Sequence, residues 1–297
     1  MRSCRMMCQL PGRLGAASLL LAALSSFAGG AGADAAAEIE DWISLFNGRD
    51  LDGWTVKIRT QEAGVDPWNT FRVEDGALTV AYDRYGEFGD RFGHIFYREP
   101  FSHYRLRLEY RFLGDPAPGT QAWAYRNSGA MLHSQAPETM PAAQNFPISI
   151  EFQFLGGLGE GPRPTGNLCT PGTNVVYRRE FTEEHCISST SQTFDGDQWV
   201  KAEALVLGAE RVVHLVNGEP VIEYGTVTYG GGAVDGHDPT LAPDGQPLAS
   251  GYISLQSEGH PIQFRDVELL NLEGCMDPEA ANYRSYYVKS DTDSCRY

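Results

Sequence analysis

The sequence predicts an all-β fold of antiparallel strands, arranged as two stacked sheets or a closed barrel. Residues 104–112 alternate apolar and charged side chains without interruption, as expected of a strand with one buried and one solvated face. No segment shows a sustained helical period, and strand patterns do not alternate with helical ones, which excludes a parallel α/β sheet. The 33 glycines and 17 prolines among 297 residues fit short strands joined by many turns.

The other elements follow one another along the chain. Residues 71–80 predict a hairpin around Asp75-Gly76, and residues 211–224 predict one around Asn217-Gly218, since both pairs tolerate the positive φ of a tight turn. Further strands are predicted at 148–155, 174–180, 198–207, 251–257 and 262–271, and loops at 59–69, 113–124, 134–146, 156–173 and 229–249. Long loops on a rigid sandwich are where binding sites are usually built.

The first 33 residues predict a cleaved export signal. Three arginines provide a positive leader, residues 14–27 are uncharged and mostly apolar, and Ala31-Gly32-Ala33 forms a small-residue cleavage site. The apolar run is too short to span a membrane, and no later segment reaches the length that a span requires. We therefore expect a secreted or periplasmic protein without a membrane span.

The charge of the chain limits its partners. Cleavage after Ala33 removes three of the 23 basic residues and no acidic one, so the net charge falls from −16 to −19. Such a surface repels phosphate backbones, which makes nucleic acid a poor partner. Anionic membranes are disfavoured for the same reason.

Four cysteines remain after the predicted cleavage, Cys169, Cys186, Cys275 and Cys295. An even number in an exported chain predicts disulfides. Three pairings are open, and the local one, Cys169 with Cys186 and Cys275 with Cys295, closes two short loops. A zinc site would require C-x-x-C spacing, which these cysteines lack. A nucleophilic cysteine is disfavoured because an oxidising compartment favours a structural bridge.

Six short motifs occur in order over residues 42–272. They are WISLFNGRDLDGW (42–54), FRVEDG (71–76), NSG (127–129), IEFQ (150–153), GYISLQSEG (251–259) and PIQFRDV (261–267). In this order they resemble the motifs of a large bacterial exported family, the 3-keto-disaccharide hydrolase domain family. The resemblance covers nearly all of residues 42–272, which we take as one β-sandwich domain between the signal and a tail at 273–297.

The resemblance implies a concanavalin-like jelly-roll sandwich that hydrolyses 3-keto glycosides. In such a sugar the C3 carbonyl acidifies the hydrogen on C2, so a base can form an enolate that expels the group at C1, after which water adds. One motif departs from the family. Many members have Leu-Gln-Asp-His-Gly where this chain has Leu-Gln-Ser-Glu258-Gly, followed by His260. The departure leaves open which residue near Glu258 acts as acid or base.

Glu151, Glu258 and His260 are the candidate catalytic residues. Period-two alternation over 148–155 places Ser149, Glu151 and Gln153 on one face of a strand whose other face is apolar. That polar face forms either the floor of a cleft or an outer surface in water, and we favour the cleft. Gln256 and Glu258 share a face in the same way, with a merely polar turn as the alternative.

The candidate substrate-binding residues come from several predicted elements: Asn127, His133, Gln153, Gln256, Arg265 and Trp123. Asn127 offers an amide to a sugar hydroxyl or forms a turn, and Trp123 stacks on a sugar or closes the sandwich core. His133 is expected on the face of Gly129 and Met131 if the strand alternates regularly. Arg265 binds a sugar oxygen or pairs with a carboxylate to hold the sheet.

The tail has a composition of its own. Gly274-Cys275-Met276-Asp277-Pro278 through Ser294-Cys295 is similar to short cysteine-bracketed modules at the ends of bacterial exported proteins. A disulfide-closed module is one interpretation. Calcium bound by Asp277, Asn282, Asp291 and Asp293 is the other, since calcium favours clustered oxygen ligands. The sequence contains no His/Asp cluster with the spacing of a dedicated metal site, and it assigns no definite cofactor.

Three functions fit these features. The first is an enzyme that cleaves oxidised glycosides, and the second is a lectin-like module that binds carbohydrate without turnover. The third is a cell-surface adhesion domain. Ordinary glucanases on such sandwiches carry paired acids in a Glu-x-Asp-x-x-Glu run, which this sequence lacks.

Overall fold

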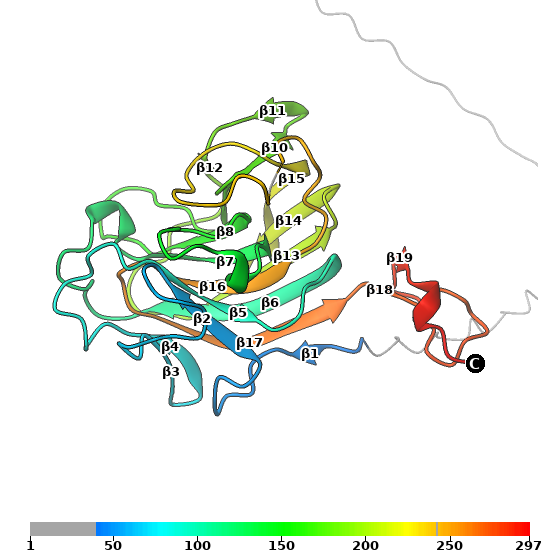
Figure 1. The fold of residues 1–297 in the computed structure, drawn as a ribbon, viewed down its shortest axis with the longest axis horizontal. Coiled ribbons are helices and arrows are strands. Elements are labelled where there is room, and N and C mark those ends of the chain that lie inside the picture. Colours follow the sequence, from blue (N-terminus) through cyan, green and yellow to red (C-terminus); the bar gives the residue numbers. More distant parts are fainter. Residues whose placement is uncertain (1–39, 242) are drawn as a thin grey trace, which may run out of the picture. The chain divides into compact units, whose positions relative to one another are not determined.

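The computed structural model describes residues 40–241 and 243–297. Over these residues the chain forms two antiparallel sheets that lie against each other (Figure 1), so the predicted all-β sandwich is confirmed. The predicted export signal, residues 1–33, lies outside the described residues. None of the described helices is long and apolar enough to cross a membrane.

The first sheet has ten strands, in the order β11-β10-β15-β14-β13-β6-β17-β4-β3, with β1 paired to β17. Its strands are β1 (Ile43–Ser44), β3 (Phe71–Glu74), β4 (Ala77–Val80), β6 (His103–Phe112), β10 (Thr173–Tyr177), β11 (Glu180–Thr182), β13 (Val200–Leu207), β14 (Arg211–Val216), β15 (Glu219–Tyr229) and β17 (Ile262–Asn271). Both predicted hairpins are present, as β3–β4 and β14–β15.

The second sheet has seven strands, in the order β12-β9-β8-β7-β16-β5-β2. They are β2 (Trp54–Ile58), β5 (Gly93–Tyr97), β7 (Asn127–Ser134), β8 (Ile150–Leu155), β9 (Asn167–Cys169), β12 (Cys186–Ile187) and β16 (Tyr252–Ser257). Three one-turn 3₁₀ helices complete the fold: η1 (Ala122–Ala124), η2 (Pro137–Thr139) and η3 (Thr292–Ser294).

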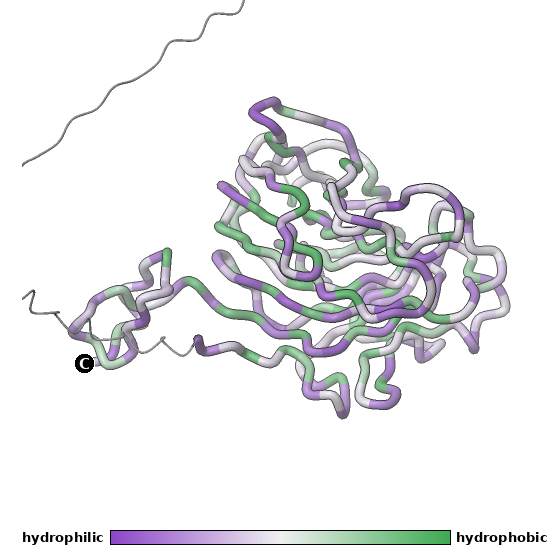
Figure 2. The backbone as a smooth tube through the Cα atoms, turned by 180° about the vertical axis from the view of Figure 1, so that it is seen from behind, coloured by the Kyte–Doolittle hydropathy of each residue, from purple (hydrophilic) through white to green (hydrophobic). Residues whose placement is uncertain are grey.

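The core lies between the two sheets. In β6 every second residue is buried, as its alternation predicts, and the apolar residues of β8 face it from the opposite sheet. The rings of Tyr110 and Phe154 stack across this interface with centroids 4.3 Å apart. Along the backbone, short hydrophobic segments (green) alternate with hydrophilic ones (purple), as Figure 2 shows.

The second sheet differs from the sequence-based prediction, which did not include its strands β2, β5 and β12. Two further differences concern β9 and β7. The segment 156–173, predicted as a loop, contains the short strand β9, which is too brief to show a period of two. In β7 the pairing with β16 shifts register between the Ser134–Tyr252 and Met131–Ser254 partners, and His133 there has a φ of 49°. This bulge breaks the alternation that placed His133 beside Met131.

The tail forms a small parallel pair of strands, β18 (Glu273–Gly274) and β19 (Lys289–Ser290). The cysteines are paired locally, as Cys169–Cys186 and Cys275–Cys295. Three of the four side chains proposed as calcium ligands are engaged in local hydrogen bonds. Asp277 and Asp291 accept bonds from nearby backbone N–H groups, and Asn282 bonds the backbone of Ser294 and Arg296. The fourth residue, Asp293, lies within η3 and donates its backbone N–H to Asp291. These bonds support the interpretation as a disulfide-closed module.

Candidate functional site

A polar row crosses the second sheet on the face turned away from the core. Strand register aligns Lys57, His94, Gln256, Gly129, Gln153 and Asn167 on six neighbouring strands. In the next row, Glu151 on β8 pairs with Met131 on one side and Cys169 on the other. The sequence therefore places Glu151, Gln153 and Gln256 on a single face of one sheet, because their strands alternate regularly here.

A cavity of about 270 Å³ opens on this face. Its wall contains five of the predicted catalytic and substrate-binding residues, one cysteine of a predicted disulfide, and three residues that the sequence analysis did not name. The first five are Glu151, Glu258, Gln153, Asn127 and Trp123, the cysteine is Cys186, and the last three are Phe146, Pro171 and His185. Glu151 and Glu258 are almost completely buried, with 6% and 4% of their surface exposed. Two carboxyl groups thus share one largely desolvated cavity.

Gly129 makes room for one of these carboxyls. It lies on β7 opposite Gln153, and the side chain of Glu151 extends over it. A Cβ atom added at position 129 would lie 2.8 Å from both Cγ and Oε1 of Glu151, closer than real Cβ atoms come to other heavy atoms. The absence of a side chain at this position therefore lets the carboxyl occupy its place in the cavity.

We expect Gly129→Ala to fold but to misplace the carboxyl of Glu151. A displacement of about 1 Å at a reacting group can cost about 100-fold in rate, so we expect a loss of about 10- to 100-fold in turnover. The melting temperature reports folding, and a crystal structure of the variant reports the position of Glu151. Normal turnover with an unmoved carboxyl would contradict the positioning role.

Burial controls the protonation of the two carboxyls. Desolvation raises the pKa of Glu151, and desolvation together with the negative charge of Glu151 raises the pKa of Glu258, against a smaller opposing effect of Arg163. Like charges in one low-dielectric cavity cannot both be ionised without cost. The pair therefore holds a proton at pH values where exposed glutamates are ionised.

This raised pKa predicts how stability varies with pH. Between the ordinary pKa of glutamate, 4.5, and the raised value, the folded state binds a proton that the unfolded state lacks, so stability falls as pH rises through this range. Glu258→Gln removes one titrating group and its repulsion. We expect the variant to be more stable than the parent at pH 8 but not at pH 4. The measurement is the melting temperature, in which each kcal/mol of stability corresponds to about 2–4 °C. Equal differences at both pH values would contradict this linkage.

Gln153 is held in one orientation by its neighbour. Asn167 Nδ2 donates to Gln153 Oε1 at 2.9 Å and to Pro164 O at 3.0 Å, while Asn167 Oδ1 accepts from the backbone N–H of Ser189 at 2.9 Å. These bonds fix the amide of Asn167 and, through it, that of Gln153. Gln153 Nε2 has no partner among the described residues, so it is a donor available to a ligand.

Further polar groups on this face are buried and have no hydrogen-bond partner among residues 40–241 and 243–297. They are Asn127 Oδ1, Glu258 Oε2, both amide atoms of Gln256 and both ring nitrogens of His94. Buried polar groups are rarely left unbonded, since each costs about 1–3 kcal/mol. Burial and the charge of Lys57 lower the pKa of His94 to about 3, which keeps this imidazole neutral. This concentration of unsatisfied groups is typical of a ligand site.

One wall of the cavity is covalently braced. Cys169 pairs with Glu151 across β8 and β9, and it forms the disulfide with Cys186 on β12. Cys186 and His185 both line the cavity. His185 could not be predicted from any periodic pattern, because the disulfide and the register of a two-residue strand bring it to the site.

Three predicted site residues lie elsewhere. His133 is buried at the bulge of β7, where its ring nitrogens face the carbonyl oxygens of Leu248 (3.2 Å) and Ser102 (3.1 Å). Arg265 donates to Glu109 at 2.8 and 2.5 Å on the ten-stranded sheet, so its structural interpretation holds. His260 follows Gly259 and packs edge-on to Phe112, outside the cavity wall. Gln256 shares the polar row but does not line the cavity either.

Trp123 lies at the edge of the cavity. Trp123 belongs to η1 and is 49% exposed. Its ring stacks on the ring of Phe92, with the two centroids 6.0 Å apart. Its indole N–H donates to Gln121 Oε1 at 2.6 Å. A fixed, exposed indole beside polar groups is suited to stacking on a sugar ring.

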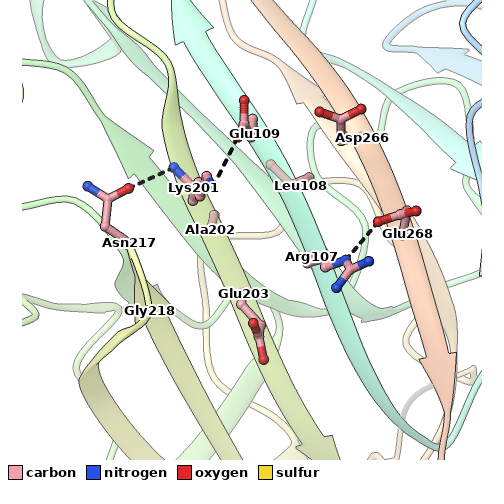
Figure 3. Close-up of a pocket in the computed structure, with 10 residues that line it drawn as sticks. All are labelled: Arg107, Leu108, Glu109, Lys201, Ala202, Glu203, Asn217, Gly218, Asp266 and Glu268. Atoms are coloured by element: carbon pink, nitrogen blue, oxygen red, sulfur yellow. Dashed lines mark hydrogen bonds and ion pairs between the residues drawn. The ribbon is translucent and has the colours of Figure 1, made fainter. Parts of the chain in front are cut away.

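A larger hollow, about 520 Å³, lies on the outer face of the ten-stranded sheet over β6, β13 and β17 (Figure 3). Its charged side chains are paired across strands: Arg107 with Glu268 at 2.7 Å, and Lys201 with Glu109 at 3.8 Å. Because these charges are already matched in ion pairs, this hollow does not offer the unpaired, desolvated groups of the smaller cavity. Across the described residues, 40–241 and 243–297, no group of three or more His, Cys, Asp or Glu side chains is arranged to hold a metal ion.

Comparisons with known proteins bear on this site. The sequence profile of the 3-keto-alpha-glucoside-1,2-lyase-like domain matches residues 41–270. No curated protein matches the chain. Among solved structures, two from Parabacteroides distasonis ATCC 8503, each proposed to be a glycosyl hydrolase, are 17% and 16% identical. They match 77% of this chain and 93% and 98% of their own, both with a TM-score of 0.45. The carbohydrate-binding module CBM66 of Bacillus subtilis is 10% identical over 74% of this chain and 96% of its own, with a TM-score of 0.40.

Proposed function

Because the chain belongs to the 3-keto-alpha-glucoside-1,2-lyase-like domain family and is therefore a carbohydrate-active protein, we propose that it hydrolyses 3-keto glycosides outside the cytoplasm. The observation that carries this proposal is the pair of buried carboxyls, Glu151 and Glu258, in one cavity. The disulfides support an oxidising compartment, and export by the predicted signal is part of the proposal.

The carboxyl pair suits elimination at C1 and C2. Because the charge of Glu151 raises the pKa of Glu258, we assign the ionised form to Glu151 and the protonated form to Glu258. Glu151 takes the proton from C2, the electrons of that bond form the enolate, and the C1–O bond breaks. Glu258 gives its proton to the departing oxygen. The products are the free aglycone and an α,β-unsaturated 3-keto sugar.

The amides of the cavity complete the site. The donor Gln153 Nε2, held by Asn167, is available to the C3 oxygen on which negative charge develops. Asn127 and Trp123 provide contacts for hydroxyl groups and for one face of the ring. Addition of water to C1, with a proton to C2, then gives the free 3-keto sugar.

The test is incubation of the purified protein with a 3-keto glucoside that carries a chromogenic aglycone, beside the matching unoxidised glucoside. We expect aglycone release from the keto compound alone, because only its C2 hydrogen is acidified. Saturable sugar binding without release from several 3-keto glycosides would instead support a lectin-like module. That alternative gives no reason for burying two carboxyls together.

A further inference from the structure

His185 is a titratable residue that lines the cavity, and the proposed elimination step does not use it. It lies directly before β12 and lines the same cavity as Glu151, Glu258 and Gln153. The residue is exposed, whereas both carboxyls are almost completely buried. An imidazole is therefore present where the cavity meets solvent.

The backbone around His185 is firmly held. Its carbonyl oxygen accepts hydrogen bonds from the backbone N–H of Thr170 at 2.8 Å and from Thr170 Oγ1 at 3.2 Å. The next residue, Cys186, is paired with Cys169 by strand register and by the disulfide. This anchoring holds the backbone that carries the imidazole at the cavity wall, as a group that acts on a bound molecule requires.

The environment keeps this imidazole in its basic form. Partial burial lowers the pKa of His185, and a smaller opposing effect comes from the backbone of Thr170. A neutral imidazole has one N–H donor and one nitrogen that accepts. At neutral pH the side chain can accordingly accept a proton and pass it to solvent.

We propose that His185 is the general base that activates water in the second half of the reaction. This inference rests on the proposed function. As the water oxygen forms its bond to C1 of the unsaturated sugar, one water proton goes to the imidazole. The C1=C2 electrons shift to give the enolate, and C2 then takes the proton that Glu151 removed. The imidazolium finally releases its proton to solvent, and Glu258, which protonated the departing oxygen, takes one up from solvent, so that one water is consumed and the free 3-keto sugar leaves.

The proposal predicts that His185→Gln slows the hydration step much more than the elimination step. With a chromogenic 3-keto glucoside, we expect aglycone release to fall less than about tenfold. Hydration should fall about 10²- to 10⁴-fold, the range for loss of a general base. The unsaturated sugar should then accumulate, seen by the ultraviolet absorbance of its conjugated ketone and by a mass lower than that of the 3-keto sugar by one water. His237→Gln is the matched control, since His237 lies outside the cavity wall and bonds Val234 O.

A second variant tests the same role by restoring it. In His185→Ala, added imidazole should restore hydration in a concentration-dependent way without changing aglycone release. Two results would overturn the proposal: formation of the 3-keto sugar by His185→Gln at the parental rate, or equal losses in both halves. Failure of the proposed function is distinct, because the parent protein would then release no aglycone.

Discussion

Glu151→Gln should reduce the release of aglycone from a 3-keto glucoside by about 10²- to 10⁴-fold, the contribution of a positioned general base. Glutamine keeps the size and hydrogen bonding of the side chain but cannot take the proton from C2. Substrate binding should change little, because the remaining groups of the cavity, Asn127, Gln153 and Trp123, are untouched. The measurement is kcat and KM for the chromogenic keto substrate, together with binding measured by calorimetry.

The matched control is Glu160→Gln, which makes the same chemical change on an exposed loop. It should retain the parental kcat. If Glu151→Gln kept full turnover, or lost binding and turnover together, the assignment of Glu151 as the base would be wrong. Weakened binding in a protein that never shows turnover would instead favour the lectin-like interpretation.

Phe154→Ala should lower the free energy of unfolding by about 3–5 kcal/mol, the cost of deleting a large buried aromatic side chain. Phe154 is completely buried and stacks on Tyr110 of the opposite sheet at 4.3 Å. Its ring also lies 5.0 Å from that of Phe152 on the same strand. Alanine would leave a cavity between the sheets directly beneath the strand that carries Glu151 and Gln153.

Chemical denaturation followed by tryptophan fluorescence measures this loss. Phe181→Ala is the control, because Phe181 is 60% exposed on β11 and its removal should change stability by less than about 0.5 kcal/mol. A domain stable by only about 5–15 kcal/mol would lose much of its margin in the core variant. Equal effects of the two substitutions would contradict the position of the core.

The fold and half of the cavity could be predicted because both follow from regular alternation. Strand β8 is the clearest example, since its apolar residues form the core while Glu151 and Gln153 line the cavity. The family motif added Asn127 and Glu258, which lie on β7 and just beyond β16. Trp123 was one of several loop aromatics, and only the structure shows that it borders the cavity.

The remaining features depend on contacts that a periodic pattern does not encode. His133 was misplaced because a single bulge in β7 reverses the direction of its side chain. Arg265 was ambiguous, since sequence alone cannot say that Glu109 lies beside it. His185 was missed because the disulfide of the next residue, Cys186, rather than a predicted strand, brings it to the cavity.

The bridge between Cys169 and Cys186 links the maturation of this protein to its destination. The disulfide beside His185 forms only when the two thiols are oxidised. A chain in a reducing cytosol therefore lacks this brace of the cavity wall. Recombinant preparations should for the same reason be directed to the periplasm or refolded with a glutathione couple.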